Sequence, residues 1–270
     1  MTLSTETKRV LKATSRTFYI PISRLPGGLQ EAMASSYLCM RAIDEIEDHS
    51  ELSRQEKSNI LHCISHIMQS QTGVDAFAME AFDDLFRPYV QLLPEVTQKL
   101  AKWACQAPAA IAPRVWDATS AMADRMAFWS LNGWQISTLA DLDHYTFSVA
   151  GAVGLLICDV GAWFDGISMH RRFAIQFGRG LQLVNILRNR HEDLNRGIDF
   201  FPQGWTTERM QAYARQNLMQ AEAYAKSLPN SSFSYFLRIP MTLAIATLDA
   251  LERGERKLSR AAVLKLVGSA

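Results

Sequence analysis

Apolar residues recur every three or four positions along most of the chain, which is the period of a helix that buries one face. Polar start signals precede several of these stripes. Ser53 and Glu56 have the spacing of a capping box, and so do Thr138 and Asp141. The period-two alternation of strands is not found. The pattern therefore predicts an all-α protein, a packed bundle of roughly ten helices.

Glycine and proline mark where the predicted helices break. Pro26, Gly27 and Gly28 precede a helix that we expect to end at Asp48. No linker or repeat divides the chain, and 48% of its residues are hydrophobic. We therefore expect residues 1–270 to form a single domain around one core.

The longest uninterrupted apolar stretch runs from Val149 to Cys158, and Asp159 closes it. Such a stretch is too short to cross a bilayer, which needs about 20 residues in a helix. The sequence therefore predicts a buried core helix at this position and no membrane anchor.

Charge and cysteine content narrow the class of protein further. The net charge is +1, with lysine and arginine scattered among acidic residues, so nucleic acid is not an expected partner. The four cysteines form no Cys-x-x-Cys pair, which is typical of free thiols in a reducing compartment. The first residues lack the apolar core of a signal peptide, so a cytoplasmic location is expected. The oligomeric state is not indicated.

Acidic residues gather near the end of the helix that follows Gly28. Tyr37, Arg41, Asp44 and Asp48 share one face of it, because successive members are three or four positions apart. Magnesium prefers carboxylate oxygens and commonly binds one or two of them together with substrate phosphates. The stripe therefore indicates a magnesium site, with a solvated acidic helix face as the alternative.

A second stripe of polar side chains contains Gln182, Asn185, Asn189 and Asp193, on a helix whose other positions are largely apolar. Buried amides need hydrogen-bond partners, so the alternatives are a polar network between helices or a solvent face. If the two stripes face each other, magnesium ions bridge them at one end of a central cavity. Apolar residues deeper along the helices then line a pocket for a hydrocarbon, which suits an amphiphile with a diphosphate head.

Several separated motifs resemble those of the squalene and phytoene synthase family, the head-to-head prenyl transferases, from about Ser15 to Pro202. Within the family, the chain is most similar to short bacterial members assigned as farnesyl diphosphate phosphatases. The matching segments are Ser15 to Tyr19, for the amino-terminal Ser-x-Ser/Thr-Phe element; Tyr37 to Asp48, for the first aspartate-rich helix; Tyr145 with Val149 to Gly154, for the central Tyr and Val-Ala-Gly-x-Val-Gly segment; and Gln182 to Pro202, for the second aspartate-rich helix.

The resemblance implies an isoprenoid synthase-type helical bundle that binds Mg²⁺ and a prenyl diphosphate such as farnesyl diphosphate. It also implies a role for each matching residue. The metal ligands are Asp44, Asp48, Asn189 and Asp193, which together with Tyr145, at the position where the allylic cation forms, are the catalytic residues. The substrate-binding residues are Ser15, Thr17, Phe18, Tyr37, Arg41, Gln182, Asn185 and Arg188.

Structural explanations stay open for several of these residues. Ser15 and Thr17 are also suited to capping a helix. Arg41 is one turn from Glu45 and is placed to pair with it, and Tyr145 is equally consistent with a hydrogen-bonded core phenol. Gly151 and Gly154 either leave room for a prenyl chain or allow two helices to pack closely.

Two departures from the family pattern decide the predicted reaction. Asn189 replaces an aspartate of most condensing members, and Phe200 replaces a tyrosine. Asparagine still offers one carbonyl oxygen to magnesium, but a two-substrate reaction demands tight placement, and a displacement of about 1 Å can cost about a hundredfold in rate. The sequence therefore predicts hydrolysis of farnesyl diphosphate to farnesol and diphosphate, with peripheral membrane contact for product release.

Two alternatives remain beside hydrolysis. One is head-to-head condensation of two prenyl diphosphates, which gives squalene, dehydrosqualene or phytoene. The other is a non-catalytic isoprenoid-binding protein that keeps the fold without turnover.

Overall fold

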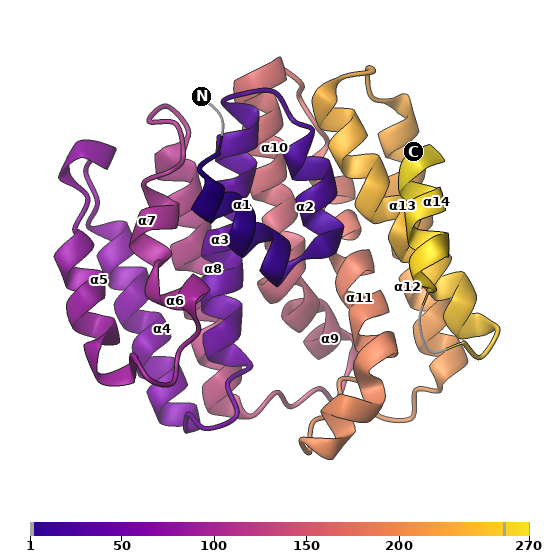
Figure 1. The fold of residues 1–270 in the computed structure, drawn as a ribbon. Coiled ribbons are helices and arrows are strands. Elements are labelled where there is room, and N and C mark those ends of the chain that lie inside the picture. The colour runs from indigo at the N-terminus through magenta and orange to yellow at the C-terminus, as the bar shows by residue number, and fades with distance from the viewer. Residues whose placement is uncertain (1–2, 256–257, 270) are drawn as a thin grey trace. The chain divides into compact units, whose positions relative to one another are not determined.

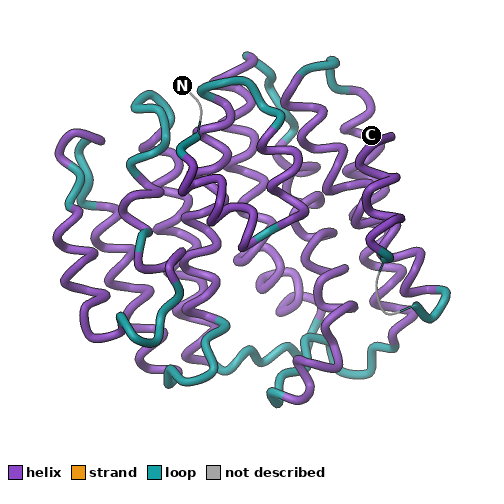
Figure 2. Tube along the Cα trace, in the orientation of Figure 1, coloured by secondary structure: helices purple, strands orange, loops and turns teal. Residues whose placement is uncertain are grey.

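The computed structural model describes residues 3–255 and 258–269. Every regular element in those residues is a helix, and loops and turns connect them (Figure 2). The predicted all-α fold is thus confirmed. The number of helices exceeds the roughly ten expected, because several short helices lie in segments with weak periodicity.

The helices form two compact units, Met1–Gly133 and Trp134–Ala270. The predicted single domain and its central cavity stay predictions, since the structure defines each unit by itself. The first unit contains α1 (Thr5–Thr14), α2 (Arg16–Ser23), α3 (Leu29–Glu47), α4 (Arg54–Gln69), η1 (Val74–Ala76), α5 (Met79–Phe86), η2 (Arg87–Tyr89), α6 (Glu95–Gln98), α7 (Leu100–Ala104) and α8 (Ala112–Asn132) (Figure 1). The second unit contains α9 (Leu139–Thr146), the π-helical segment η3 (Phe147–Gly151), α10 (Ala152–Asp165), α11 (Arg171–Asn195), α12 (Thr207–Ser227), α13 (Ser232–Glu252) and α14 (Arg260–Ser269).

Helix α3 is the core helix of the first unit and packs against α4, α6, α7 and α8. It begins after Gly28, whose φ of 82° favours glycine, and Asp48 is its C-cap, as the sequence predicts. Trp103 is fully buried beside it. The Trp103 ring donates to the Val96 carbonyl at 2.8 Å, and the Trp103 carbonyl accepts from the Ser35 hydroxyl at 2.7 Å. These bonds satisfy the buried polar atoms around α3 and hold it in place.

Both predicted capping boxes are present. The Ser53 hydroxyl accepts from the Glu56 N–H at 3.2 Å, and the Glu56 carboxylate accepts from the Ser53 N–H at 2.9 Å. Thr138 and Asp141 make the same reciprocal pair at 3.2 and 2.8 Å. The local sequence therefore defines where α4 and α9 begin.

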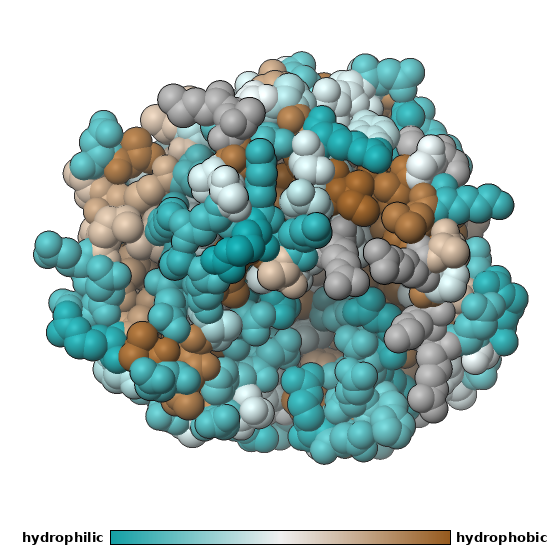
Figure 3. Space-filling view, in the orientation of Figure 1, coloured by the Kyte–Doolittle hydropathy of each residue, from teal (hydrophilic) through white to brown (hydrophobic). Residues whose placement is uncertain are grey.

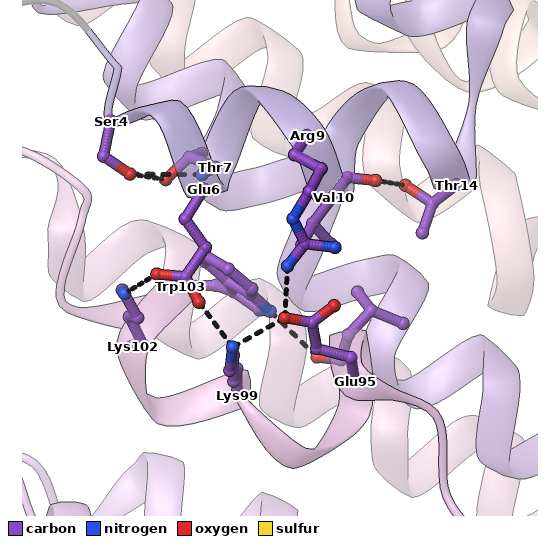
Figure 4. A network of polar contacts seen from close by, with 11 residues as sticks. Ser4, Glu6, Thr7, Arg9, Val10, Thr14, Glu95, Lys99, Lys102 and Trp103 are labelled. Carbon is purple, nitrogen blue, oxygen red and sulfur yellow. Dashed lines mark hydrogen bonds and ion pairs between the residues drawn. The ribbon is translucent and has the colours of Figure 1, made fainter.

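An ion network connects α1 to α6 and α7 (Figure 4). Glu6 pairs with Lys99 and Lys102, while Glu95 pairs with Arg9 and with Lys99, the latter at 2.6 Å. Hydrogen bonds from Arg9 and Lys99 lower the pKa of Glu95 from 4.5 to about 2. Because the pKa of Glu95 is lowered, the stabilisation that its bonds give the folded state is complete above about pH 4.5. This stabilisation is lost as the pH falls towards 2.

Helix α11 is the core helix of the second unit and packs against α9, η3, α10, α12 and α13. Its contact with η3 and α10 depends on glycine. A Cβ atom added to Gly154 would lie 2.1 Å from the Ala174 carbonyl oxygen, and one added to Gly178 would lie 2.2 Å from the Ala150 carbonyl oxygen. Of the two explanations for Gly154, close helix packing is therefore the one that the structure supports.

One helix among the described residues, Leu139–Asp165, is long and apolar enough to cross a membrane, with a mean hydropathy of 1.8 in its best window. The expectation that the helix in this region is too short to cross a membrane is wrong, because the helix runs from Leu139 to Asp165 and not only from Val149 to Cys158. Within the window, 44% of the residues are buried in the fold. A core helix of a globular protein passes the same test of length and composition.

Large apolar side chains are exposed at separate places on both units. Phe128 and Leu131, one turn apart on α8, are each 49% exposed, and Met219 on α12 is 59% exposed. On the face drawn in Figure 3, hydrophilic residues predominate and hydrophobic residues form separate areas. Scattered exposure of this kind is normal for folded proteins.

Candidate functional site

The amino-terminal Ser-x-Thr-Phe element lies against the polar stripe of α3. Ser15 connects α1 and α2, and its hydroxyl caps α2 by accepting from the Phe18 N–H at 3.0 Å. The Phe18 ring lies 5.4 Å from the Tyr37 ring. Burial raises the pKa of Tyr37, and hydrogen bonds with Ser15 and Thr14 oppose that rise. The amino-terminal element and the α3 stripe, which are separate in sequence, are thus in contact. The side chain of Thr17 is exposed.

Arg41 is the only cation of the predicted α3 stripe, and it binds the carboxylates next to it. One of its terminal nitrogens pairs with Asp44 and the other with Glu45. The predicted pairing with Glu45 is therefore present. The Arg41 Nε is buried and has no hydrogen-bond partner among the described residues. One N–H of this guanidinium is thus left without an acceptor.

Three carboxylates converge at the carboxyl end of α3. Asp44, Glu47 and Asp48 each place one oxygen within 4.8 Å of the others. These are hard oxygen donors, and their mutual repulsion is relieved by a dication, so the residues present fit magnesium. Glu47, which is 5% exposed, is not among the ligands predicted from the sequence. The signal that was available is its spacing, three residues after Asp44 and directly before Asp48.

A buried lysine fixes the same end of α3. The Lys57 ammonium, on α4, donates to the Glu47 carbonyl at 2.6 Å, and Lys57 is only 7% exposed. This carbonyl is one of those that a helix leaves without an internal partner at its carboxyl end. Lys57 therefore anchors the backbone that carries the carboxylate cluster.

The protonation of Asp44 couples metal binding to pH. Burial, together with the nearby charge of Asp48, raises the pKa of Asp44 from 3.8 to about 7. A protonated carboxyl group is no magnesium ligand, so affinity is expected to rise with pH until Asp44 is ionised. We expect magnesium to bind about tenfold more weakly at pH 6 than at pH 8, as a single proton competes with the metal.

Isothermal titration calorimetry in buffers of different ionisation enthalpy measures both the affinity and the proton released. Asp84→Asn, which changes an exposed aspartate outside the cluster, provides the control and should keep the wild-type pH profile. A magnesium affinity that is constant from pH 6 to 8 in the wild-type protein would contradict the raised pKa.

The second predicted stripe lies on α11, and its amides bind an arginine. Arg188 donates to Asn185 Oδ1 at 2.7 Å and to Asn189 Oδ1 at 3.2 Å. The Asn189 amide nitrogen donates to Asn185 Oδ1 at 3.2 Å. Gln182 is half-buried on the same helix. These hydrogen bonds lie within α11, so they are not the network between helices that the sequence left open as an alternative.

Asp193 is the only carboxylate of the second stripe and is buried, with 6% of its surface exposed. Its Oδ1 accepts from Arg196 at 2.6 Å. The two residues are three positions apart near the end of α11, so this ion pair is local to the end of one helix.

Tyr145 is buried near the end of α9, and the π-helical segment directly follows that helix. Its ring stacks on Phe200, with 4.6 Å between centroids and 20° between planes. The Asp143 carbonyl nearby accepts from Arg179 at 3.0 Å, and the Asp143 carboxylate accepts from Tyr213 at 2.5 Å. Burial and the hydrogen bond to Asp143 together raise the pKa of Tyr213 to about 12. The core position of Tyr145 is thus confirmed, and its catalytic role stays a prediction.

The predicted site residues divide between the two units, and each unit brings its own residues together. The facing of the two stripes stays a prediction. The first unit holds Ser15, Thr17, Phe18, Tyr37, Arg41, Asp44 and Asp48, and the second holds Tyr145, Gln182, Asn185, Arg188, Asn189 and Asp193.

Known proteins similar to this chain include squalene synthases of fungi and an alga. Squalene synthase of Schizosaccharomyces pombe is 25% identical over 91% of this chain and 59% of its own length, and that of Yarrowia lipolytica is 28% identical over 93% and 62%. Squalene synthase BSS of Botryococcus braunii is 30% identical over 69% of this chain and 40% of its own length. The chain thus spans less than two thirds of the length of these relatives.

Solved structures show the same fold. Two structures of TcSQS, each in complex with a ligand, are 21% identical to this chain and cover 97% of it, with TM-scores of 0.78 and 0.74. Each alignment covers 84% of the TcSQS chain. In addition, residues 11–212 match the family described as Squalene/phytoene synthase. The chain therefore belongs to the squalene/phytoene synthase family, as its motifs predict.

Proposed function

We propose that this protein is a magnesium-dependent enzyme that ionises a prenyl diphosphate and condenses two such molecules head to head. The observation that carries the proposal is the carboxylate cluster of Asp44, Glu47 and Asp48 beside Arg41, in a chain of this family. The similar proteins are named squalene synthases, which supports condensation better than the hydrolysis expected from sequence. Farnesyl diphosphate is the proposed substrate.

The carboxylates and the arginine near the end of α3 have different proposed roles. Asp44, Glu47 and Asp48 would hold the metal, and Arg41 would donate its buried Nε–H to a diphosphate oxygen. When bound, magnesium supplies Lewis-acid neutralisation of the charge that develops on the departing diphosphate. Lys57 holds the end of α3, so the carboxylates need not reorganise when the charge develops.

Residues at the amino terminus and in the second unit would bind the rest of the substrate. Phe18 and Tyr37 form an aromatic pair beside Ser15 and provide an apolar surface with hydroxyl groups at its edge. Tyr145, stacked on Phe200, presents an aromatic face that stabilises an adjacent carbocation.

Hydrolysis is the second candidate, and one observation favours it. In the second stripe, Asn189 contributes an amide where most condensing members have a carboxylate, and its oxygen already accepts from Arg188. Weaker fixation of a second diphosphate would leave the allylic cation to water, which gives a prenyl alcohol.

One incubation decides between these functions. Purified protein is given farnesyl diphosphate and magnesium, with and without NADPH, and the organic extract and the released diphosphate are analysed. A hydrocarbon of twice the substrate length supports condensation, while farnesol alone overturns it in favour of hydrolysis. Binding without diphosphate release overturns both and indicates a non-catalytic isoprenoid-binding protein. The Asp44→Asn protein serves as the control for spontaneous solvolysis.

A further inference from the structure

The guanidinium of Arg188 lies across two amide oxygens of α11. Its Nε donates to Asn189 Oδ1 at 3.2 Å, and a terminal nitrogen donates to Asn185 Oδ1 at 2.7 Å. The Asn189 nitrogen donates to the same Asn185 oxygen at 3.2 Å. These contacts fix the orientation of the Asn189 amide, because its oxygen faces a donor and its nitrogen faces an acceptor.

Amides and carboxylates differ in what they can bind at such a position. A carboxylate has two oxygens, so an aspartate can bind an arginine with one and a metal ion with the other. Asn189 has a single oxygen, and Arg188 already donates to it. The other terminal atom of Asn189 is an NH₂ group, which is a donor and not a metal ligand.

The remaining carboxylate of the stripe is also engaged by a cation. Asp193 Oδ1 accepts from Arg196 at 2.6 Å. Guanidinium groups therefore contact one oxygen each of Asn185, Asn189 and Asp193, and their positive charge repels a dication. The α3 cluster differs in kind, because three carboxylates converge there within 4.8 Å.

We infer that Asn189 is no metal ligand in this protein and that it instead orients the Arg188 guanidinium, which this stripe offers to an anionic ligand. Magnesium is bound by α3. The amide of Asn189 is the reason, since an aspartate at this position would have a second oxygen for a metal ion. The inference rests on the magnesium requirement of the proposed function and is independent of which product forms.

Metal binding to substituted proteins tests this directly. Bound manganese(II) is counted by electron paramagnetic resonance, with and without inorganic pyrophosphate. Asp44→Asn is expected to lose metal binding, whereas Asn189→Ala is expected to keep the wild-type affinity within about twofold. Asn189→Asp is expected to bind at least one additional ion.

Asn195→Asp is the matched control for Asn189→Asp. It adds the same charge to the same helix at an exposed residue, whose amide contacts His191 at 3.2 Å, and it is expected to bind manganese as the wild type does. Circular dichroism establishes that each variant is folded.

Three results would overturn the inference. They are a loss of affinity in Asn189→Ala as large as that in Asp44→Asn, an Asn189→Asp protein that binds like the wild type, and a wild-type protein that binds no manganese in either condition. Failure of the proposed function differs, because farnesyl diphosphate then gives farnesol or stays unconsumed while the binding pattern of the variants is as expected.

Discussion

Replacement of Asp44 or Asp48 by asparagine is expected to lower the rate of farnesyl diphosphate consumption on the order of a thousandfold. Each substitution keeps the size of the side chain but removes one negative charge from the α3 cluster. In Asp44→Asn, Arg41 also loses one of its two charged partners and keeps Glu45. The diphosphate would then depart without full charge neutralisation, and its release, followed by a pyrophosphate assay, measures the effect.

Asp84→Asn is the matched control for this prediction. Asp84 is an exposed aspartate on α5 that pairs with Arg87 three residues on, and its substitution is expected to leave the rate within about twofold of the wild type. If Asp44→Asn and Asp48→Asn are folded and retain more than a tenth of the wild-type rate, the α3 cluster is not the catalytic metal site.

Gly178→Ala is expected to destabilise the fold by about 2 kcal/mol, because the new methyl group meets backbone and not a flexible side chain. The added Cβ would lie 2.2 Å from the Ala150 carbonyl oxygen, so α11 and η3 must separate. Alanine gains about 1 kcal/mol in helix propensity over glycine, which offsets part of the larger steric cost. Urea denaturation followed by circular dichroism measures the difference in unfolding free energy.

Gly73→Ala is the control for steric cost. Gly73 has extended backbone, and no heavy atom lies within 4 Å of the position that its new methyl group would take, so the stability should change by less than about 0.5 kcal/mol. A Gly178→Ala protein with wild-type stability would show that the contact between α11 and η3 is looser than described.

Local sequence signals predict those features of the fold, such as helix starts, that depend only on neighbouring residues. The capping boxes at Ser53 and Thr138 are determined by side chains within one helical turn. The helix from Leu139 to Asp165 is longer than its uninterrupted apolar run, because polar residues within it also adopt helical backbone.

The parts of the site that the sequence does not predict depend on tertiary contacts. Glu47 looks like any acidic residue of the stripe until its burial is known. The donation from Lys57 to the Glu47 carbonyl requires that α4 fold back along α3. The motif assigns Arg188 to substrate binding, but its contact with Asn185 and Asn189 depends on rotamers that spacing alone does not specify.

The π-helical segment Phe147–Gly151 sets the rotational phase of the residues before it. A π turn accommodates one more residue than an α turn, and each residue of an α-helix corresponds to a rotation of about 100° about the axis. Tyr145 therefore points in a direction that a continuous α-helix through α10 would not give it. In this direction its ring stacks on Phe200. Deletion of one residue from this segment would turn the tyrosine away from Phe200 without changing any side chain that contacts it.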